Sequence, residues 1–283
     1  MSIENKGSAA VLEIDGSAPN GARAEWHSTA GDGDRHCSGG GADQAGLTTD
    51  EPGRMQAIDG EGGLGPPGAR QASFAFSRRL VCLSAPNGAT AASYRSLQTH
   101  LLARHVGAGR RALAVCSPQP ATGCTTVAVN LAVACAQAGI NTLLVDANLV
   151  RPAVHQFIRP ADGGTAGLAQ MLLADPANQV DAICRNVLPN LAVLFAGGLP
   201  PSDLVVQRRF KEVVDHCMRS FDFTIVDTPP ASDGAHARHV AMAVRYAMMV
   251  VRRDVTFLAD MKKTTAELTN DRVSLLGSFL TDF

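Results

Sequence analysis

The stretch from Ala112 to Asp146 constrains the fold of this chain more than any other. It opens with Ala112–Cys116, a short apolar run typical of a buried strand. The small apolar residues from Cys124 to Ala138 form a run too long for a strand and predict a helix, with Gly139 as the residue that ends it. A second buried strand is predicted over Asn141–Val145, directly before the aspartate. This order is one right-handed βαβ unit, which predicts an α/β fold with a doubly wound, mostly parallel sheet.

The loop inside this unit, Ser117–Gly123, occupies the position of a phosphate-binding loop. In such a loop the backbone N–H groups and the N-terminus of the following helix face a phosphate group. Gly123 is the glycine before the helix, and the hydroxyl of Thr125 is placed to hold Mg²⁺. The loop therefore predicts a degenerate P-loop.

Cys124 stands where a P-loop has its lysine, and no lysine occurs between Lys6 and Lys211. The missing charge predicts weak or absent ATP binding, because lysine contacts the β- and γ-phosphates. A cysteine at a helix N-terminus is also predicted to ionise easily, and so to be the fastest-alkylating cysteine of the folded core. The alternative is that Cys124 only fills the space left by the lysine.

Two further segments accompany the loop: LLVDANLVRP at 143–152 and FDFTIVDTPP at 221–230. Together the three resemble the MinD/ParA-like P-loop ATPases, and most closely the kinase domain of bacterial tyrosine kinases. The resemblance covers about residues 90–283. It implies a sheet of about seven strands, ATP and Mg²⁺ as cofactors, and a role in exopolysaccharide or capsule synthesis.

The resemblance also implies roles for individual residues. The residues expected to bind the nucleotide are Gly123, Cys124, Thr125 and Thr126. Those expected to hold the metal are Thr125, Asp146 and Asp227. Those expected to act in catalysis are Asp146, Asp227 and Arg151. Asp227 ends a Walker B-like strand and would hold a Mg²⁺-bound water, whereas Asp146 would order Mg²⁺ or the attacking hydroxyl. Asp146 has a simpler alternative, a cap at the end of its strand. The family's second aspartate is Asn148 here, which supplies neither charge nor base.

The chain departs from the family elsewhere. Its two tyrosines, Tyr94 and Tyr246, lie within predicted elements, so the tyrosine-rich tail of these kinases has no counterpart. Of the E-x-x-R-x-x-R motif that assembles a ring of subunits, Arg95 alone remains, and its helix at 91–104 is equally well explained by packing. Thr281 replaces an asparagine that helps frame the adenine pocket.

These departures predict a catalytically impaired, regulatory protein. Its expected partner is an inner-membrane polysaccharide co-polymerase whose cytosolic tail docks near the nucleotide site. A homo-oligomer is possible, and no nucleic-acid partner is expected. One alternative is an active ATP-dependent protein-tyrosine kinase of the same pathway. Another is a MinD/ParA-type positioning ATPase, although residues 117–122 lack the extra lysine usual in those proteins.

Composition divides the chain near residue 70. Residues 1–70 hold 15 of the 27 glycines and 11 acidic against 5 basic residues, and they lack a sustained apolar period. We therefore predict that 1–70 is disordered and that 71–283 is the P-loop domain. The sequence shows no secretory signal, no apolar run long enough to span a membrane and no C-x-x-C pair, which predicts a cytoplasmic protein. The partner that the resemblance implies would make the protein peripheral at the inner membrane.

Apolar patterns and turn residues predict the remaining elements. Two short helices are expected over Thr165–Leu173 and Val180–Arg185, and a longer one from Pro201 to about Arg219. The remaining predicted strands are Leu191–Phe195, Phe221–Asp227, Tyr246–Val251 and Leu275–Leu280. The last predicted helix is Leu258–Leu268.

Overall fold

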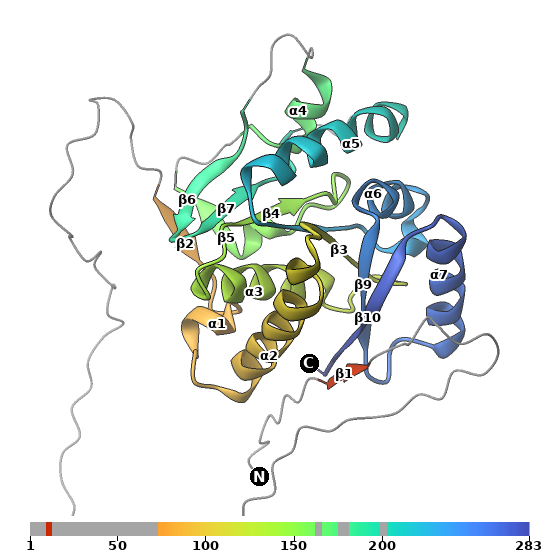
Figure 1. Cartoon of the computed structure of the whole chain (residues 1–283), viewed down its shortest axis with the longest axis horizontal. Coiled ribbons are helices and arrows are strands. Elements are labelled where there is room, and N and C mark those ends of the chain that lie inside the picture. The colour runs from red at the N-terminus through yellow and green to blue at the C-terminus, as the bar shows by residue number, and fades with distance from the viewer. Residues whose placement is uncertain (1–9, 13–72, 162–165, 175–180, 199–202, 283) are drawn as a thin grey trace, which may run out of the picture. The chain divides into compact units, whose positions relative to one another are not determined.

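The computed structural model of the chain describes residues 10–12, 73–161, 166–174, 181–198 and 203–282. Its main sheet has eight strands in the order β1-β10-β9-β3-β8-β4-β7-β6 (Figure 1). Six are parallel: β3 (Ala112–Cys116), β4 (Thr142–Asp146), β7 (Leu191–Leu194), β8 (Phe223–Asp227), β9 (Tyr246–Arg252) and β10 (Ser274–Thr281). The edge strands β1 (Ala10–Leu12) and β6 (Cys184–Leu188) are antiparallel to their neighbours. The predicted doubly wound, mostly parallel sheet is confirmed.

The predicted βαβ unit is present as β3, α3 (Cys124–Gln137) and β4. The small residues of α3 let it pack closely, and every residue from Val127 to Ala136 is buried. Gly139 follows with φ of 83°, a left-handed conformation that glycine adopts without steric cost. The unit thus folds as its local pattern indicates.

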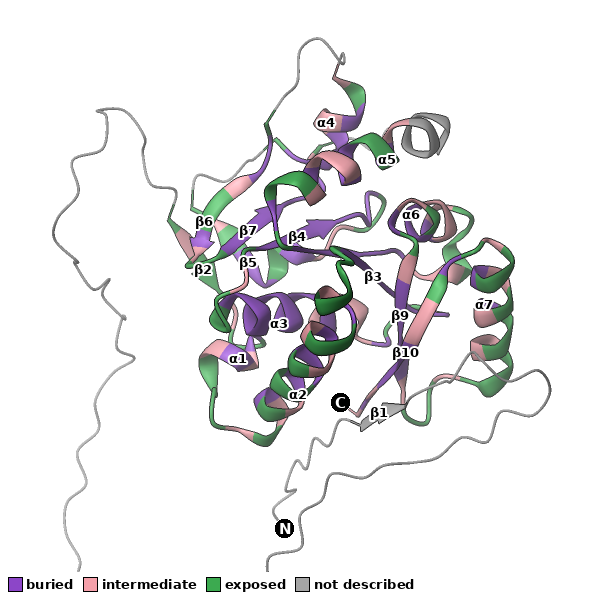
Figure 2. Ribbon diagram, in the orientation of Figure 1, coloured by how far each residue is buried: buried purple, intermediate pink, exposed green. Residues whose placement is uncertain are grey.

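Helices cover both faces of the sheet (Figure 1). Alternate residues of β3 face opposite sides: Leu113 and Val115 join the core beneath α2 (Ala89–Arg104) and α3, while Ala114 and Cys116 join the other core. The second core is covered by α4 (Leu168–Leu173), α5 (Asp203–Ser220), α6 (His236–Val244) and α7 (Leu258–Asn270). Figure 2 shows the central strands as the most continuously buried part of the fold. Burial on both faces explains why these strands are continuous apolar runs.

A small second sheet lies at one side of the P-loop. It pairs β2 (Phe74–Phe76) with β5 (Ile158–Pro160) in antiparallel register, and β2 is followed by the short helix α1 (Val81–Ser84). Helix α1 is joined to the helix layer of the main sheet, because the backbone N–H of Cys82 donates to Asn130 Oδ1 of α3 at 3.3 Å. The pairing of β2 with β5 brings residues 74–84, which are distant in sequence, beside the P-loop.

The helix predicted over Val180–Arg185 is wrong. Cys184–Leu188 form strand β6, which pairs with β7 through a turn at Asn190, where φ is 61°. Asparagine tolerates this left-handed conformation, which tight hairpin turns need. The partner strand therefore decided the conformation of a segment whose own pattern was ambiguous.

The N-terminal segment contributes one described element, since β1 adds residues 10–12 to the edge of the main sheet beside β10. The rest of residues 1–70 lies outside the described residues, so its disorder and the domain boundary at residue 70 stay predictions. Within the described parts of the chain, no helix combines the length and apolar character needed to cross a membrane.

Candidate functional site

The P-loop opens onto a cavity of about 230 Å³ at the carboxyl edge of the sheet. Gly123 is the N-cap of α3 and has φ of 88°, so the turn into the helix uses a backbone conformation that favours glycine. The cavity is lined by residues 120–126 of the loop and helix, together with Arg79, Ser117, Asn148, Arg151, Ala153, Gln156, Phe157, Thr228 and Pro230. Gly123, Cys124, Thr125 and Thr126 therefore line one concave site, and their role in nucleotide binding stays a prediction.

Thr125 joins the cavity to Asp227, which is fully buried and is not among the residues that line it. The Thr125 hydroxyl donates a 2.6 Å hydrogen bond to Asp227 Oδ2, and Asp227 Oδ1 is buried with no hydrogen-bond partner among the described residues. Hydroxyl and carboxylate oxygens are the ligands that Mg²⁺ prefers. The unpartnered carboxylate oxygen of Asp227, beside the hydroxyl of Thr125, fits a Mg²⁺ ion bound with a nucleotide.

Asp146 lies directly beside Asp227, because the two are register partners at the ends of β4 and β8. Both oxygens of Asp146 accept backbone hydrogen bonds: Oδ1 from Asn148 at 3.2 Å, and Oδ2 from Ala153 and Val154 at 3.1 Å each. The carboxylate thus organises the loop after its own strand. This is the strand-end cap that was the alternative to a metal role, so the metal role of Asp146 stays a proposal.

The two buried carboxyl groups hold their protons more tightly than ordinary ones. Burial raises the pKa of Asp146 to about 6, although its backbone hydrogen bonds oppose the rise. Burial also raises the pKa of Asp227 to about 8; the charge of Asp146 adds to the rise, and the hydrogen bond from Thr125 opposes it. The site therefore favours a cation beside these groups, since a cation would stabilise their ionised forms.

The side chain of Cys124 turns back toward the strand that precedes the P-loop. Its Sγ donates to the backbone carbonyl of Val115, at 3.1 Å, in the strand beneath the loop. Burial, followed by the charge of Asp227, raises the pKa of the Cys124 thiol well above its ordinary value. The prediction of an easily ionised thiolate is wrong, because burial and the neighbouring charge of Asp227 both oppose ionisation of the sulfur.

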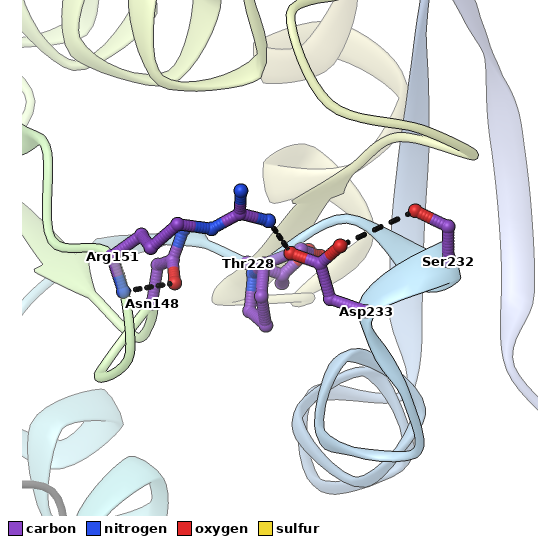
Figure 3. Close-up of polar contacts among 6 residues, drawn as sticks. Asn148, Arg151, Thr228, Ser232 and Asp233 are labelled. Carbon is purple, nitrogen blue, oxygen red and sulfur yellow. Dashed lines mark hydrogen bonds and ion pairs between the residues drawn. The ribbon is translucent and has the colours of Figure 1, made fainter.

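Arg151 reaches across the mouth of the site to Asp233 in the 3-10 turn after β8 (Figure 3). Its guanidinium Nη2 pairs with Asp233 Oδ2, and its backbone N–H donates to Asn148 Oδ1 at 3.0 Å. Arg151 thus lines the cavity while it is paired with Asp233, and its catalytic role stays a prediction. Asn148 uses its carbonyl to shape the loop.

Hydrogen bonds tie the P-loop to the ends of two other strands. The Walker B turn is joined to the start of the loop, since the backbone N–H of Thr228 donates to the Val115 carbonyl at 3.1 Å and that of Ala231 to the Ser117 carbonyl at 2.8 Å. From the last strand, the buried Thr281 hydroxyl donates to the Thr122 carbonyl at 2.8 Å. These contacts fix the P-loop against β8 and β10.

The sequence analysis missed Arg79 and Phe157, both of which line the cavity. Arg79 belongs to a mixed apolar and basic stretch, and no local pattern connects this stretch with the P-loop. Only the pairing of β2 with β5 places it there. Among the described residues, no cluster of three or more His, Cys, Asp or Glu side chains is arranged as a metal site.

Sequence comparison identifies tyrosine-protein kinases as relatives. The chain is 28% identical over 209 residues to the tyrosine-protein kinase YwqD of Bacillus subtilis, covering 72% of this chain and 86% of that protein. It is 30% identical over 174 residues to the tyrosine-protein kinase CpsD of Streptococcus agalactiae, covering 61% of this chain and 73% of that protein. No protein-family model matches the chain.

Solved structures share the fold. The chimerical protein CapA2B2 aligns with a TM-score of 0.62 at 25% identity, over 75% of this chain and 92% of that one. The kinase domain of the Escherichia coli tyrosine kinase ETK gives a TM-score of 0.65 at 21% identity, over 72% and 79%. The cell division ATPase MinD of Pyrococcus furiosus gives a TM-score of 0.50 at 25% identity, over 60% of this chain and 70% of that one.

The same family is indicated by the P-loop, by the aspartates that end β4 and β8, by the sheet order and by these relatives. The chain belongs to the bacterial tyrosine kinase family, which has the fold of MinD/ParA-like P-loop ATPases.

Proposed function

We propose that this protein is a catalytically impaired member of its family that regulates exopolysaccharide or capsule biosynthesis. The observation that carries the proposal is the position of Cys124. It stands at the site of the P-loop lysine, and its sulfur is hydrogen-bonded to the Val115 carbonyl. The protein would bind Mg-ATP weakly, transfer phosphate poorly or not at all, and act through its conformation.

The partner we propose is an inner-membrane chain-length co-polymerase whose cytosolic tail docks near the nucleotide site. The bacterial tyrosine kinase family supports this partner, and the chimerical protein CapA2B2 is among the structures that share the fold. The protein would then work in the cytoplasm, peripheral to the inner membrane, and self-association into a homo-oligomer is compatible with this role. A Mg²⁺ ion would be held by Thr125 and Asp227, and by Asp146 if its backbone hydrogen bonds are released.

A second candidate is an active ATP-dependent protein-tyrosine kinase. The observation that favours it is the intact hydrogen bond between Thr125 and Asp227. The third candidate, a MinD/ParA-type positioning ATPase, shares the fold but has no lysine in residues 117–122 to support it.

Calorimetric titration of the full chain with Mg-ATP tests the proposal. Cys124→Lys adds the missing charge, and Cys124→Ser is the matched control because it removes the thiol without adding charge. A charge-assisted phosphate contact contributes about 1.5–3 kcal/mol, so the lysine variant should bind about 10- to 150-fold more tightly than the natural chain. Low-micromolar binding by the natural chain, together with tyrosine phosphorylation of a peptide, would contradict the proposal.

A further inference from the structure

We propose that Arg79 replaces part of the positive charge that Cys124 lacks, by binding the terminal phosphate of a nucleoside diphosphate or triphosphate. Arg79 lies in the segment between β2 and α1, outside the P-loop, yet it lines the same cavity as Gly123 and Thr125. The inference rests on the proposed function in one respect, namely that this cavity binds a nucleotide.

The backbone of Arg79 is held against the first turns of α3. Its carbonyl accepts a hydrogen bond from Asn130 Nδ2 at 3.2 Å, and the same amide group donates to the Thr126 carbonyl at 2.9 Å. Asn130 is fully buried in α3, so its position is fixed by the core. Arg79 is therefore attached to the helix whose N-terminus forms the anion-binding loop.

The side chain of Arg79 is also directed by its surroundings. Its guanidinium carbon lies 4.5 Å from the centre of the Phe157 ring, and its Nη2 lies 3.5 Å from Thr126 Oγ1. Phe157 is 2% exposed, and its carbonyl accepts from the backbone N–H of Ser77 at 2.9 Å. A guanidinium stacked on a buried ring loses less conformational freedom when it binds a ligand.

The charge of Arg79 is not neutralised within the described part of the chain, where no carboxylate pairs with it. Arg151, the other arginine of the cavity, is paired with Asp233. Thr122 also lines the cavity; it is 1% exposed, and its hydroxyl has no hydrogen-bond partner among the described residues. A guanidinium without a carboxylate partner, an unpartnered hydroxyl and the N-terminus of α3 together suit a phosphate group, which arginine binds with two parallel hydrogen bonds.

The test is the affinity of the full chain for Mg-ADP, with inorganic phosphate titrated separately to separate a nucleotide site from a simple anion site. Arg79→Gln removes the charge. Arg78→Gln is the matched control, since it makes the same change at the adjacent exposed position, which does not line the cavity. We expect Arg79→Gln to weaken Mg-ADP binding about tenfold or more and Arg78→Gln to leave it within about twofold. Both variants should still unfold cooperatively without ligand, which shows that any loss of affinity is not a loss of folding.

A second variant checks that the two positions share one role. Adding Cys124→Lys to Arg79→Gln should restore Mg-ADP binding, because either cation can serve the same phosphate. Equal affinities of the natural chain, Arg79→Gln and Arg78→Gln would overturn the inference, and so would saturable binding that appears only when Cys124→Lys is present. Tight binding of phosphate alone, unaffected by the nucleoside, would also overturn it. Detection of tyrosine phosphorylation by the natural chain would instead contradict the proposed impairment and leave the effect of Arg79 on affinity intact.

Discussion

Asp146 and Asp227 are register partners at the ends of adjacent parallel strands, and the charge of Asp146 adds to the raised pKa of Asp227. Among the described residues, no salt bridge joins either carboxyl group to a cationic side chain. The fold therefore carries buried acidic groups at the edge where a phosphate-bound cation would lie. Without a bound cation, the burial of these two carboxyl groups lowers the free energy of unfolding by an amount that depends on pH.

We predict that the free energy of unfolding, measured in EDTA, falls as the pH rises from about 4 to about 8. The folded pKa values of about 6 and about 8 exceed the ordinary value of 3.8, so the folded chain binds more protons than the unfolded chain across this window. Each group that takes up a full proton on folding contributes a slope of up to about 1.4 kcal/mol per pH unit.

Urea titrations at pH 5 and pH 8 measure this slope. Asp227→Asn should flatten it, because the amide cannot ionise, whereas Asp222→Asn at the exposed approach to β8 should leave it unchanged. An equal slope for the natural chain and Asp227→Asn would show that Asp227 does not titrate in this range.

Alkylation should be slow at Cys124. A thiol with a raised pKa is protonated at pH 7, and the Cys124 sulfur is engaged with the Val115 carbonyl. After brief iodoacetamide treatment of the folded chain, mass spectrometry should find Cys124 labelled no faster than Cys116 or Cys135. The unfolded chain in urea is the control, in which all three should react alike. Preferential labelling of Cys124 would restore the thiolate hypothesis.

Thr281→Val should lower the free energy of unfolding by about 0.5–1.5 kcal/mol, the usual net contribution of one hydrogen bond. The change keeps the shape of the side chain but removes the hydroxyl that donates to Thr122 of the P-loop. Thr269→Val, at an exposed position of α7, is the control and should cost less. Equal effects of the two variants in denaturant titrations would mean that this tie between β10 and the P-loop contributes little.

Removal of residues 1–70 should leave a chain that unfolds cooperatively, with a modestly lower melting temperature because β1 no longer pairs with β10. Val11→Pro in the full chain is the matched variant, since proline removes the backbone donor of β1 while the segment remains. Both changes should lower the melting temperature alike if β1 is the only stabilising part of the segment. A non-cooperative melt of the shortened chain would place the domain boundary elsewhere.

The sequence by itself determined the βαβ unit, the parallel sheet and the edge at which Asp146 and Asp227 meet. These follow from patterns within a few residues, because buried parallel strands are continuous apolar runs and end at a common edge. The resemblance extended this to the P-loop residues, which the structure brings into one cavity.

Only the tertiary structure decided the chemistry of that cavity. The fold raises the pKa of the Cys124 thiol by burying it and by placing it near Asp227, which is distant in sequence. Arg79 reaches Thr126, 47 residues away, because β2 pairs with β5. Cys184 and Arg185 belong to a strand rather than to the predicted helix because β7 offered a partner. Such contacts join residues far apart in the chain, and their energies depend on burial and pairing that no local pattern contains.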